Sequence, residues 1–180
     1  MAVANRHLDL GLVQVYTGNG KGKTTAALGQ ALRAIGRGLT VYMAQFIKGQ
    51  ETGELLAVER LAPDFTIRQF GSGKFIVQRE PSQDERDLAR TGWLEIVKVV
   101  DDGQHDIVIL DDISHAIRVG LIELEQVLQL IAQRPRGVEI ILTGRSMPRE
   151  LLEAADLVTD MVAIKHPYDQ GIQVRKGIEF

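Results

Sequence analysis

A short run of glycine and lysine between a strand pattern and a helix pattern constrains the fold of this chain more than any other feature. Residues 12–16 have the apolar pattern of a strand, and residues 23–37 carry apolar side chains at helical spacing. Between them, Gly18 to Thr24 reads Gly-Asn-Gly-Lys-Gly-Lys-Thr. Glycine permits backbone angles that are closed to other residues, so the chain can turn sharply here. The pattern predicts a strand–loop–helix unit.

The predicted loop has the residue types of a phosphate-binding loop. Backbone amides of the loop and of the helix N-terminus would point inward, and we expect Lys23 to neutralise phosphate oxygens and Thr24 to bind Mg²⁺ through its hydroxyl. Lys21 adds a second positive charge. The other predicted contacts are Gly18, Asn19, Gly20, Gly22 and Thr25. The usual pattern has a glycine where this chain has Thr17, and the alternative is a glycine-rich turn with incidental lysines.

Short apolar runs alternate with helical patterns along the rest of the chain. Strands are predicted at residues 39–46, 65–70, 106–111, 138–143 and 157–164, and helices at 82–101, 123–134 and 148–155. Ser82 and Glu85 have the spacing of a capping box. The alternation predicts an α/β fold of the P-loop NTPase kind, with a mostly parallel sheet and helices on both faces. We expect one domain over 1–180, with a short arm at 1–10 and a turn or tail at 165–180.

Two neighbouring carboxylates follow the apolar strand pattern of residues 107–110. Asp111 and Asp112 would emerge at the carboxyl edge of the sheet, where the glycine loop also opens. Together with Thr24 they offer the oxygen ligands that Mg²⁺ or Mn²⁺ takes beside a triphosphate. The alternative is a helix N-cap with a solvated neighbour.

Three further charged residues are predicted near the same edge. Lys48 follows the strand at 39–46, and Arg145 follows the strand at 138–143, so each is a candidate ligand contact. Glu54 begins a short helix, where its charge is also favourable against the helix dipole. For each of the three, a solvated or purely structural role remains the alternative.

Composition excludes several classes of function. The 180 residues include 21 basic and 24 acidic side chains, a net charge of −3 with no basic run, which argues against nucleic acid as the main partner. The chain has no cysteine, which fits a reducing compartment, and it has no apolar run near the ~20 residues that span a bilayer. We therefore expect a cytoplasmic protein without a membrane partner. No zinc spacing or nucleophile elbow is present, so the substrates of an enzyme with this sequence would supply the reacting atoms.

Several segments taken together resemble one family. They are 17–27 (TGNGKGKTTAA), 45–49 (QFIKG) with Gly53-Glu54, Leu110-Asp111-Asp112, Thr143-Gly144-Arg145, 165–169 (KHPYD) and the ending GIEF. In combination they resemble the P-loop corrinoid adenosyltransferases of the ATP:cob(I)alamin type, from about residue 11 to the end.

The resemblance implies a reaction and its substrates. The family transfers the 5′-deoxyadenosyl group of ATP to the reduced cobalt of a corrinoid and releases triphosphate, with the nucleotide reversed in the loop. It implies Lys21, Lys23 and Thr24 as catalytic groups and a homodimer, and it leaves open a reductase that delivers the reduced corrinoid. The rival interpretations are a P-loop nucleotide hydrolase or small-molecule kinase, and a nucleotide-binding module without catalysis.

Two positions depart from the family pattern. Asp112 stands where many members have glutamate, so it is one methylene shorter. An aromatic pair that members use against the lower face of the corrinoid is reduced to Phe75, shifted by one place. We expect Phe75 to contact the corrinoid, and an ordinary core phenylalanine is the alternative.

Overall fold

A parallel sheet organises the computed structural model, which describes residues 8–73, 76 and 79–180. In these residues the sheet has six strands in the order β3-β2-β4-β5-β1-β6, and every neighbouring pair is parallel. The strands are β1 (Val13–Thr17), β2 (Val41–Gln45), β3 (Phe65–Gln69), β4 (Ile107–Asp111), β5 (Glu139–Thr143) and β6 (Leu157–Asp160). The predicted α/β class is confirmed.

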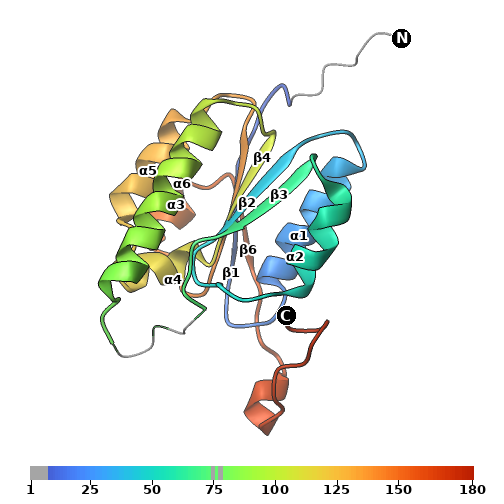
Figure 1. Cartoon of the computed structure of the whole chain (residues 1–180), viewed down its shortest axis with the longest axis vertical. Helices are drawn as coiled ribbons and strands as arrows, with labels where there is room; N and C mark the ends of the chain where they lie inside the picture. The colour runs from blue at the N-terminus through green and yellow to red at the C-terminus, as the bar shows by residue number, and fades with distance from the viewer. Residues whose placement is uncertain (1–7, 74–75, 77–78) are drawn as a thin grey trace.

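Helices cover both faces of the sheet, as Figure 1 shows with the sheet seen edge-on. On one face lie α1 (Lys23–Ile35) and α2 (Gly53–Val58), the latter continued by η1 (Glu59–Leu61). On the other lie α3 (Gln83–Asp101), α4 (Ile113–Arg118), α5 (Leu124–Gln133) and α6 (Arg149–Ala154). Two apolar cores result, one on each side of the sheet.

Burial along the strands follows from this layering. Every residue of β2, β4 and β5 is buried, because these inner strands are covered on both faces, and their apolar runs are typical of such strands. The edge strand β6 is exposed throughout. Polar residues inside the inner strands therefore need partners within the protein, and Gln45 and Asp111 find them at the carboxyl ends.

The N-terminus of a helix was predicted correctly where the sequence carries a local capping signal. The capping box of α3 is present, since Ser82 accepts from the Glu85 amide and Glu85 accepts from the Ser82 amide. A second capping box, Glu123 with Gln126, opens α5 and was not predicted. Helix α4 was not predicted either, because its six residues directly after a strand are too few for a period to show.

The last strand is shorter than predicted, ending at Asp160 instead of residue 164. Its partner β1 ends at Thr17, so beyond this point the chain has no strand to pair with. Met161 still donates to the Thr17 carbonyl oxygen at 2.9 Å and then turns onto the glycine loop.

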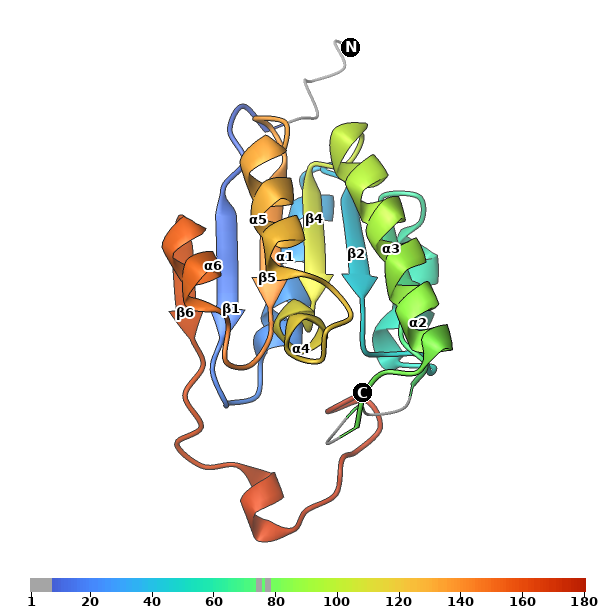
Figure 2. The ribbon, with the colours of Figure 1, turned by 90° about the vertical axis from the view of Figure 1, so that its left-hand side faces the viewer.

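The segment after β6 crosses beneath the carboxyl edge of the sheet, as Figures 1 and 2 both show. It includes the short helix η2 (Pro167–Gln170) and returns toward the start of α2. The carbonyl oxygen of Phe180 lies 3.9 Å from where a Cβ of Gly53 would stand. Among the described residues no helix is both long and apolar enough to cross a membrane.

Candidate functional site

The glycine loop joins β1 to α1, as the sequence predicts. Gly18 and Gly22 have φ angles of 96° and 125°, in the region that favours glycine. Gly22 is the N-cap of α1, and no side chain caps this helix. The first amides of a 13-residue helix are thus left for a ligand, and a helix N-terminus of this kind is suited to bind phosphate.

The outer wall of the loop is the chain that follows β6. The amide of Gly20 donates to the carbonyl oxygen of Met161 at 2.6 Å. A Cβ on Gly20 would stand 2.6 Å from that same oxygen, and a Cβ on Gly18 would collide with the Asp160 carboxylate. These two glycines are therefore required by protein packing as well as by any close approach of phosphate.

Lys23 lies across the loop. Its Nζ donates to the carbonyl oxygens of Gly18 at 2.7 Å and Gly20 at 2.8 Å, so the ammonium sits where the loop encloses it. Burial lowers the pKa of Lys23, and the nearby charge of Arg145 lowers it further, against the opposing effect of neighbouring carboxylates. Anionic oxygens of a triphosphate in the loop would stabilise the charged ammonium.

The other predicted loop contacts are more open. Asn19, Lys21 and Thr25 are exposed on the described surface. The charge of Lys21 helps to lower the pKa of Glu179, after the hydrogen bonds that Glu179 makes with Arg175.

Asp111 connects four elements at the carboxyl edge. Its side chain is fully buried, and its Oδ1 accepts from the hydroxyls of Thr24 at 2.8 Å and Thr143 at 2.7 Å. Its Oδ2 accepts from Gln45 Nε2 at 3.1 Å and lies 3.3 Å from Lys48 Nζ. A buried carboxylate with four such partners is satisfied as an anion. The end of the glycine loop thus lies directly against the carboxyl end of β4.

Asp112 has a different environment. It adopts the left-handed conformation at φ 57° as the N-cap of α4, and its amide donates to Thr143 Oγ1 at 3.0 Å. Asp112 is thus the N-cap residue of α4 by position, but its side chain makes no capping hydrogen bond to the helix. Burial and the neighbouring Asp111 charge raise the pKa of Asp112 to about 6. The described residues give its carboxylate no hydrogen bond, so its oxygens are available to a cation.

Lys48 and Glu54 form an ion pair beside Asp111. Their Nζ and Oε1 atoms are 3.0 Å apart, and Gln45 Nε2 also donates to Glu54 at 3.1 Å. Burial disfavours both charged forms, but the charges of Asp111 and Glu54 outweigh it and raise the pKa of Lys48. Burial likewise opposes ionisation of Glu54, and Lys48 outweighs it, so the pKa of Glu54 is lowered. Both residues lie at the site, as the sequence predicts, and are bonded to each other.

Arg145 is exposed next to the loop. The carbonyl oxygen of Arg145 accepts from Ser114 Oγ at 2.6 Å, which fixes the backbone of this turn. Its positive charge acts to lower the pKa of both Lys23 and Asp112, so the guanidinium lies near both groups. Phe75 lies outside the described residues, and its predicted contact stays a prediction.

Sequence reasoning missed Gln45 and Thr143 as parts of this site. Gln45 is fully buried and bonds Asp111, Glu54 and, through its Oε1, Gln69 Nε2 at 3.0 Å. The signal was a polar residue at the carboxyl end of an apolar strand, which a buried position tolerates only with partners.

The donor set fits a hard cation. No group of three or more His, Cys, Asp or Glu suited to a metal occurs among the residues the structure describes. Thr24, Asp111 and Asp112 offer side-chain oxygen ligands. Mg²⁺ in proteins is usually coordinated by one or two carboxylates together with water and substrate phosphates. The residues present therefore fit Mg²⁺ held against a bound triphosphate.

Comparison with known proteins gives the family. Residues 9–180 match the family model described as ATP:corrinoid adenosyltransferase BtuR/CobO/CobP. Corrinoid adenosyltransferases of Escherichia coli K12 and Pseudomonas aeruginosa are each 35% identical over 99% of this chain, covering 90% and 88% of their own lengths. Corrinoid adenosyltransferase CobA of Salmonella typhimurium is 33% identical over 99% of this chain and 90% of its own.

Solved structures agree on the fold. The flagellar accessory protein FlaH of Methanocaldococcus jannaschii aligns over 85% of this chain and 72% of its own, with a TM-score of 0.56 and 12% identity. A KaiC-like protein of Pyrococcus horikoshii aligns over 85% of this chain and 73% of its own, with a TM-score of 0.53 and 16% identity. At these identities the likeness supports the P-loop NTPase-like fold alone. The family match over residues 9–180 and the three close-to-full-length relatives show that this chain belongs to the ATP:corrinoid adenosyltransferase family.

Proposed function

We propose that this protein transfers the 5′-deoxyadenosyl group of ATP to the reduced cobalt of a corrinoid and releases triphosphate. The observation that carries the proposal is family membership over residues 9–180, combined with a glycine loop that encloses the Lys23 ammonium and whose Thr24 hydroxyl donates to Asp111. The hydrolase and kinase alternatives are not favoured by the three relatives described above, each of which is named as a corrinoid adenosyltransferase.

The proposed chemistry matches the groups at the site. A reduced cobalt is a strong nucleophile without a proton to lose, so no general base is needed. As the cobalt–carbon bond forms at C5′, the C5′–oxygen bond breaks and its electron pair leaves with the triphosphate. The protein must orient C5′ and stabilise the departing charge, and Lys21, Lys23 and the loop amides are suited to this.

We propose that Thr24, Asp111 and Asp112 hold Mg²⁺, or Mn²⁺ in its place. Bound there, the cation would neutralise triphosphate oxygens and so make the triphosphate a better leaving group. Asp112 has the freer carboxylate and is the better candidate for direct contact. Asp111 already bonds Thr24, so it would act by orienting that hydroxyl or through a water molecule.

The remaining predicted site residues are assigned roles according to the charged partners that each has in the structure. Arg145 is exposed and its charge lies near Lys23 and Asp112, so we assign it to phosphate or ribose. Lys48 and Glu54 neutralise each other, so we assign them to the wall of the site, where either is within reach of a ligand. Phe75 is assigned to the corrinoid on the resemblance alone.

We further propose one domain over residues 1–180, a homodimer and a cytoplasmic location. One sheet with two cores supports the single domain, and the lack of cysteine fits a reducing compartment. The partners would be ATP and a reduced corrinoid, with a reductase as donor and with neither nucleic acid nor membrane involved. The homodimer rests on the family, and the reductase on the need for a donor that reduces the corrinoid.

The test is anaerobic incubation with ATP, Mg²⁺ and chemically reduced cobalamin, followed by absorption spectra before and after illumination. The proposal expects a light-sensitive product whose formation requires both ATP and protein. A nucleotide-binding module would retain ATP and leave the corrinoid spectrum unchanged, which would overturn the proposal.

A further inference from the structure

The last residues of four neighbouring strands form a row of polar side chains across the carboxyl edge of the sheet. β3 ends at Gln69, β2 at Gln45, β4 at Asp111 and β5 at Thr143. The register pairs Gln45 with both Gln69 and Asp111, and it places Thr143 beside Asp111. Side chains in register on neighbouring strands point to the same face, so the four lie side by side. We call these four residues the polar row.

The polar row lies on the face of the sheet that α1 and α2 cover. Thr24 of α1 donates to Asp111 at 2.8 Å, and Glu54 of α2 accepts from Gln45 at 3.1 Å. The three inner members of the row are fully buried, whereas Gln69, on the edge strand β3, is half-buried. The row therefore runs from the edge of the sheet to the residues assigned above to the metal.

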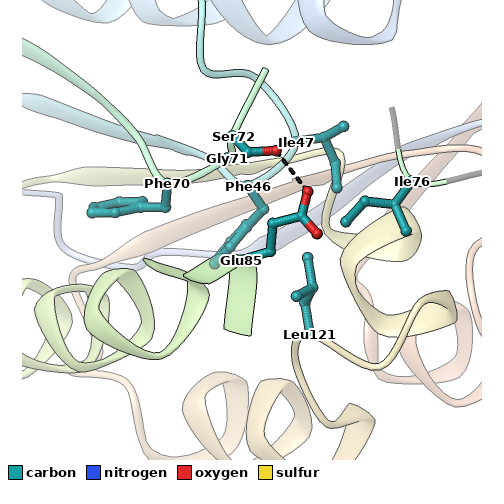
Figure 3. A pocket seen from close by; sticks show the side chains of 8 residues that line it. All are labelled: Phe46, Ile47, Phe70, Gly71, Ser72, Ile76, Glu85 and Leu121. Atoms are coloured by element: carbon teal, nitrogen blue, oxygen red, sulfur yellow. Dashed lines mark hydrogen bonds between the residues drawn. The ribbon is translucent and has the colours of Figure 1, made fainter. Parts of the chain in front are cut away.

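Two phenylalanines hold the glutamines of the row on this face. Phe46 and Phe70 directly follow Gln45 and Gln69 and are buried in the core on the opposite face, with ring centroids 6.3 Å apart (Figure 3). The cavity beside the rings has a volume of about 10 Å³, enough for at most one water molecule, so the rings have little room to move. Because successive side chains of an extended chain point to opposite faces, these rings fix the side to which both glutamines point.

The hydrogen bonds of the row have only one possible direction. Asp111 and Glu54 are carboxylates and can only accept, so the Gln45 amide must turn its Nε2 toward them, and it donates to each at 3.1 Å. The Gln45 Oε1 is then left facing Gln69, whose Nε2 donates to it at 3.0 Å. From the other side, the Thr143 hydroxyl donates to Asp111 at 2.7 Å. Gln69 must therefore be a donor for the buried row to be fully bonded.

The bonds of Gln45 determine how the Asp111 carboxylate is oriented. Gln45 Nε2 and Lys48 Nζ both contact Asp111 Oδ2, at 3.1 and 3.3 Å, while Oδ1 accepts from the hydroxyl of Thr24. If the Gln45 amide turned over, its Oε1 would face Asp111 Oδ2 and leave both oxygens without this donor, which is costly in a buried site. The carboxylate would then rotate, and the Thr24 hydroxyl bonded to it would lose its orientation.

We propose that Gln69 is a positioning residue for the metal site, which acts by donating to Gln45 and so fixes the carboxylate of Asp111. Gln69 does not touch the cation, because two strand spacings, about 10 Å, separate β3 from β4. This inference rests on the proposed function, since it takes Mg²⁺ to bind beside Asp111 together with the triphosphate.

Three substitutions that differ in donor and acceptor character test this role. Gln69→Lys keeps a donor, Gln69→Glu supplies only an acceptor and Gln69→Leu supplies neither. Binding of ATP is measured by calorimetry at a series of Mg²⁺ concentrations, without corrinoid, so the readout does not depend on turnover. Gln69→Glu should raise the Mg²⁺ concentration for half-maximal ATP binding about tenfold, the scale of one buried hydrogen bond. Gln69→Leu should raise it less, and Gln69→Lys should stay within about twofold of the wild-type value.

The order of these effects separates hydrogen bonding from simple electrostatics. A negative charge at position 69 attracts Mg²⁺ and a positive charge repels it, so charge alone predicts tighter Mg²⁺ binding in Gln69→Glu and weaker binding in Gln69→Lys. The polar row predicts the reverse order.

Arg68→Gln is the matched control for charge. It lowers the net charge by the same amount as Gln69→Glu, at the preceding residue of the same strand. The Arg68 side chain lies on the other face of the sheet, where its Nη2 is 3.6 Å from Glu95 Oε2. Arg68→Gln should therefore leave the Mg²⁺ dependence of ATP binding within about twofold of the wild-type value.

A second measurement follows the Gln45 amide directly. Its side-chain protons are buried and donated to two carboxylates, so NMR should show slow hydrogen exchange for them in the unaltered protein and in Gln69→Lys. In Gln69→Glu and Gln69→Leu the Gln45 Oε1 loses its donor, so exchange of these protons should be faster. Thermal unfolding of each variant is recorded beside the NMR spectra.

Two outcomes would overturn the inference. In the first, all three variants at position 69 keep the wild-type Mg²⁺ dependence and slow exchange of the Gln45 amide. In the second, Gln69→Lys raises the Mg²⁺ requirement as much as Gln69→Glu does. Failure of the proposed function is distinct from both, because the unaltered protein would then bind ATP with Mg²⁺ and form no adenosylated corrinoid.

Discussion

The hydroxyl of Thr24 donates a 2.8 Å hydrogen bond to the carboxylate of Asp111, across 87 positions of sequence. This contact brings the end of the glycine loop to the end of β4. It leaves the lone pairs of the Thr24 oxygen free for a cation and gives Asp111 a position beside that cation. The predictions below follow from this arrangement.

Lys23→Ala should nearly abolish ATP binding or turnover. The ammonium lies inside the loop with its Nζ on two loop carbonyls, so its loss should cost roughly 2 kcal/mol or more, about a thirtyfold fall in affinity. The exposed Lys21 is the control, because Lys21→Ala should lower ATP affinity less than Lys23→Ala does. The effect of Lys21→Ala should also become smaller at high salt, since salt screens an exposed charge. ATP affinity by calorimetry, with steady-state kinetics, makes the comparison. Near-normal values for Lys23→Ala would sink the phosphate-loop assignment.

Asp111→Asn and Asp112→Asn should separate stability from metal use. The amide at position 111 would place a donor against Gln45 or Lys48 in a fully buried site, so the Tm should fall, with a loss of about 3 kcal/mol or more in unfolding free energy. The Asp112 carboxylate accepts no hydrogen bond from the described residues, and burial beside Asp111 raises its pKa, so its charge destabilises the fold at neutral pH. Asp112→Asn removes that charge and should raise the Tm. It should raise the Mg²⁺ concentration for half-maximal activity about tenfold, because a direct ligand loses its charge.

Titration of activity with Mg²⁺, alongside thermal unfolding, checks both variants. Unchanged metal dependence in both would mean that neither carboxylate serves the metal. A larger metal effect for Asp111→Asn at wild-type stability would instead make Asp111 the direct ligand.

The glycines of two helices should respond to alanine in opposite directions. A Cβ at Gly29 in α1 meets nothing within 4 Å, so Gly29→Ala should stabilise the protein by about 0.5–1 kcal/mol through helix propensity. A Cβ at Gly92 in α3 would collide with the ring of Phe70, so Gly92→Ala should destabilise it by about 1–3 kcal/mol. Denaturant unfolding measures both. Equal effects would contradict the described packing of α3 on Phe70.

Local signals in the sequence account for much of the fold. The loop from Gly18 to Thr24, the apolar strands and the capping box of α3 each depend on neighbouring residues, and the structure has them as predicted. Helix α4 and the early end of β6 depend on distant partners. The turn into α4 at Asp112 is held by a hydrogen bond from its amide to Thr143, and β6 ends where the Met161 carbonyl oxygen accepts from Gly20. Neither feature could be predicted from a local hydrophobic period.

The residues of the candidate site likewise differ in whether the local sequence could predict them. The sequence places Lys23, Thr24 and Asp111 at one edge because parallel strands end together. It does not show that Gln45 bonds Asp111, since a buried amide in an apolar strand is recognised only when its partners across the sheet are known.

The phosphorus products of the reaction test the central claim most directly. Attack of the reduced cobalt at C5′ makes the whole triphosphate the leaving group, whereas a kinase or hydrolase breaks the bond to the terminal phosphate. The protein is incubated under anaerobic reducing conditions with ATP and Mg²⁺, with and without corrinoid, and the products are followed by phosphorus NMR. Corrinoid should stimulate ATP consumption, and tripolyphosphate should appear one-for-one with a light-sensitive adenosylated corrinoid, without ADP. Formation of ADP and orthophosphate at the same rate without corrinoid would contradict the account.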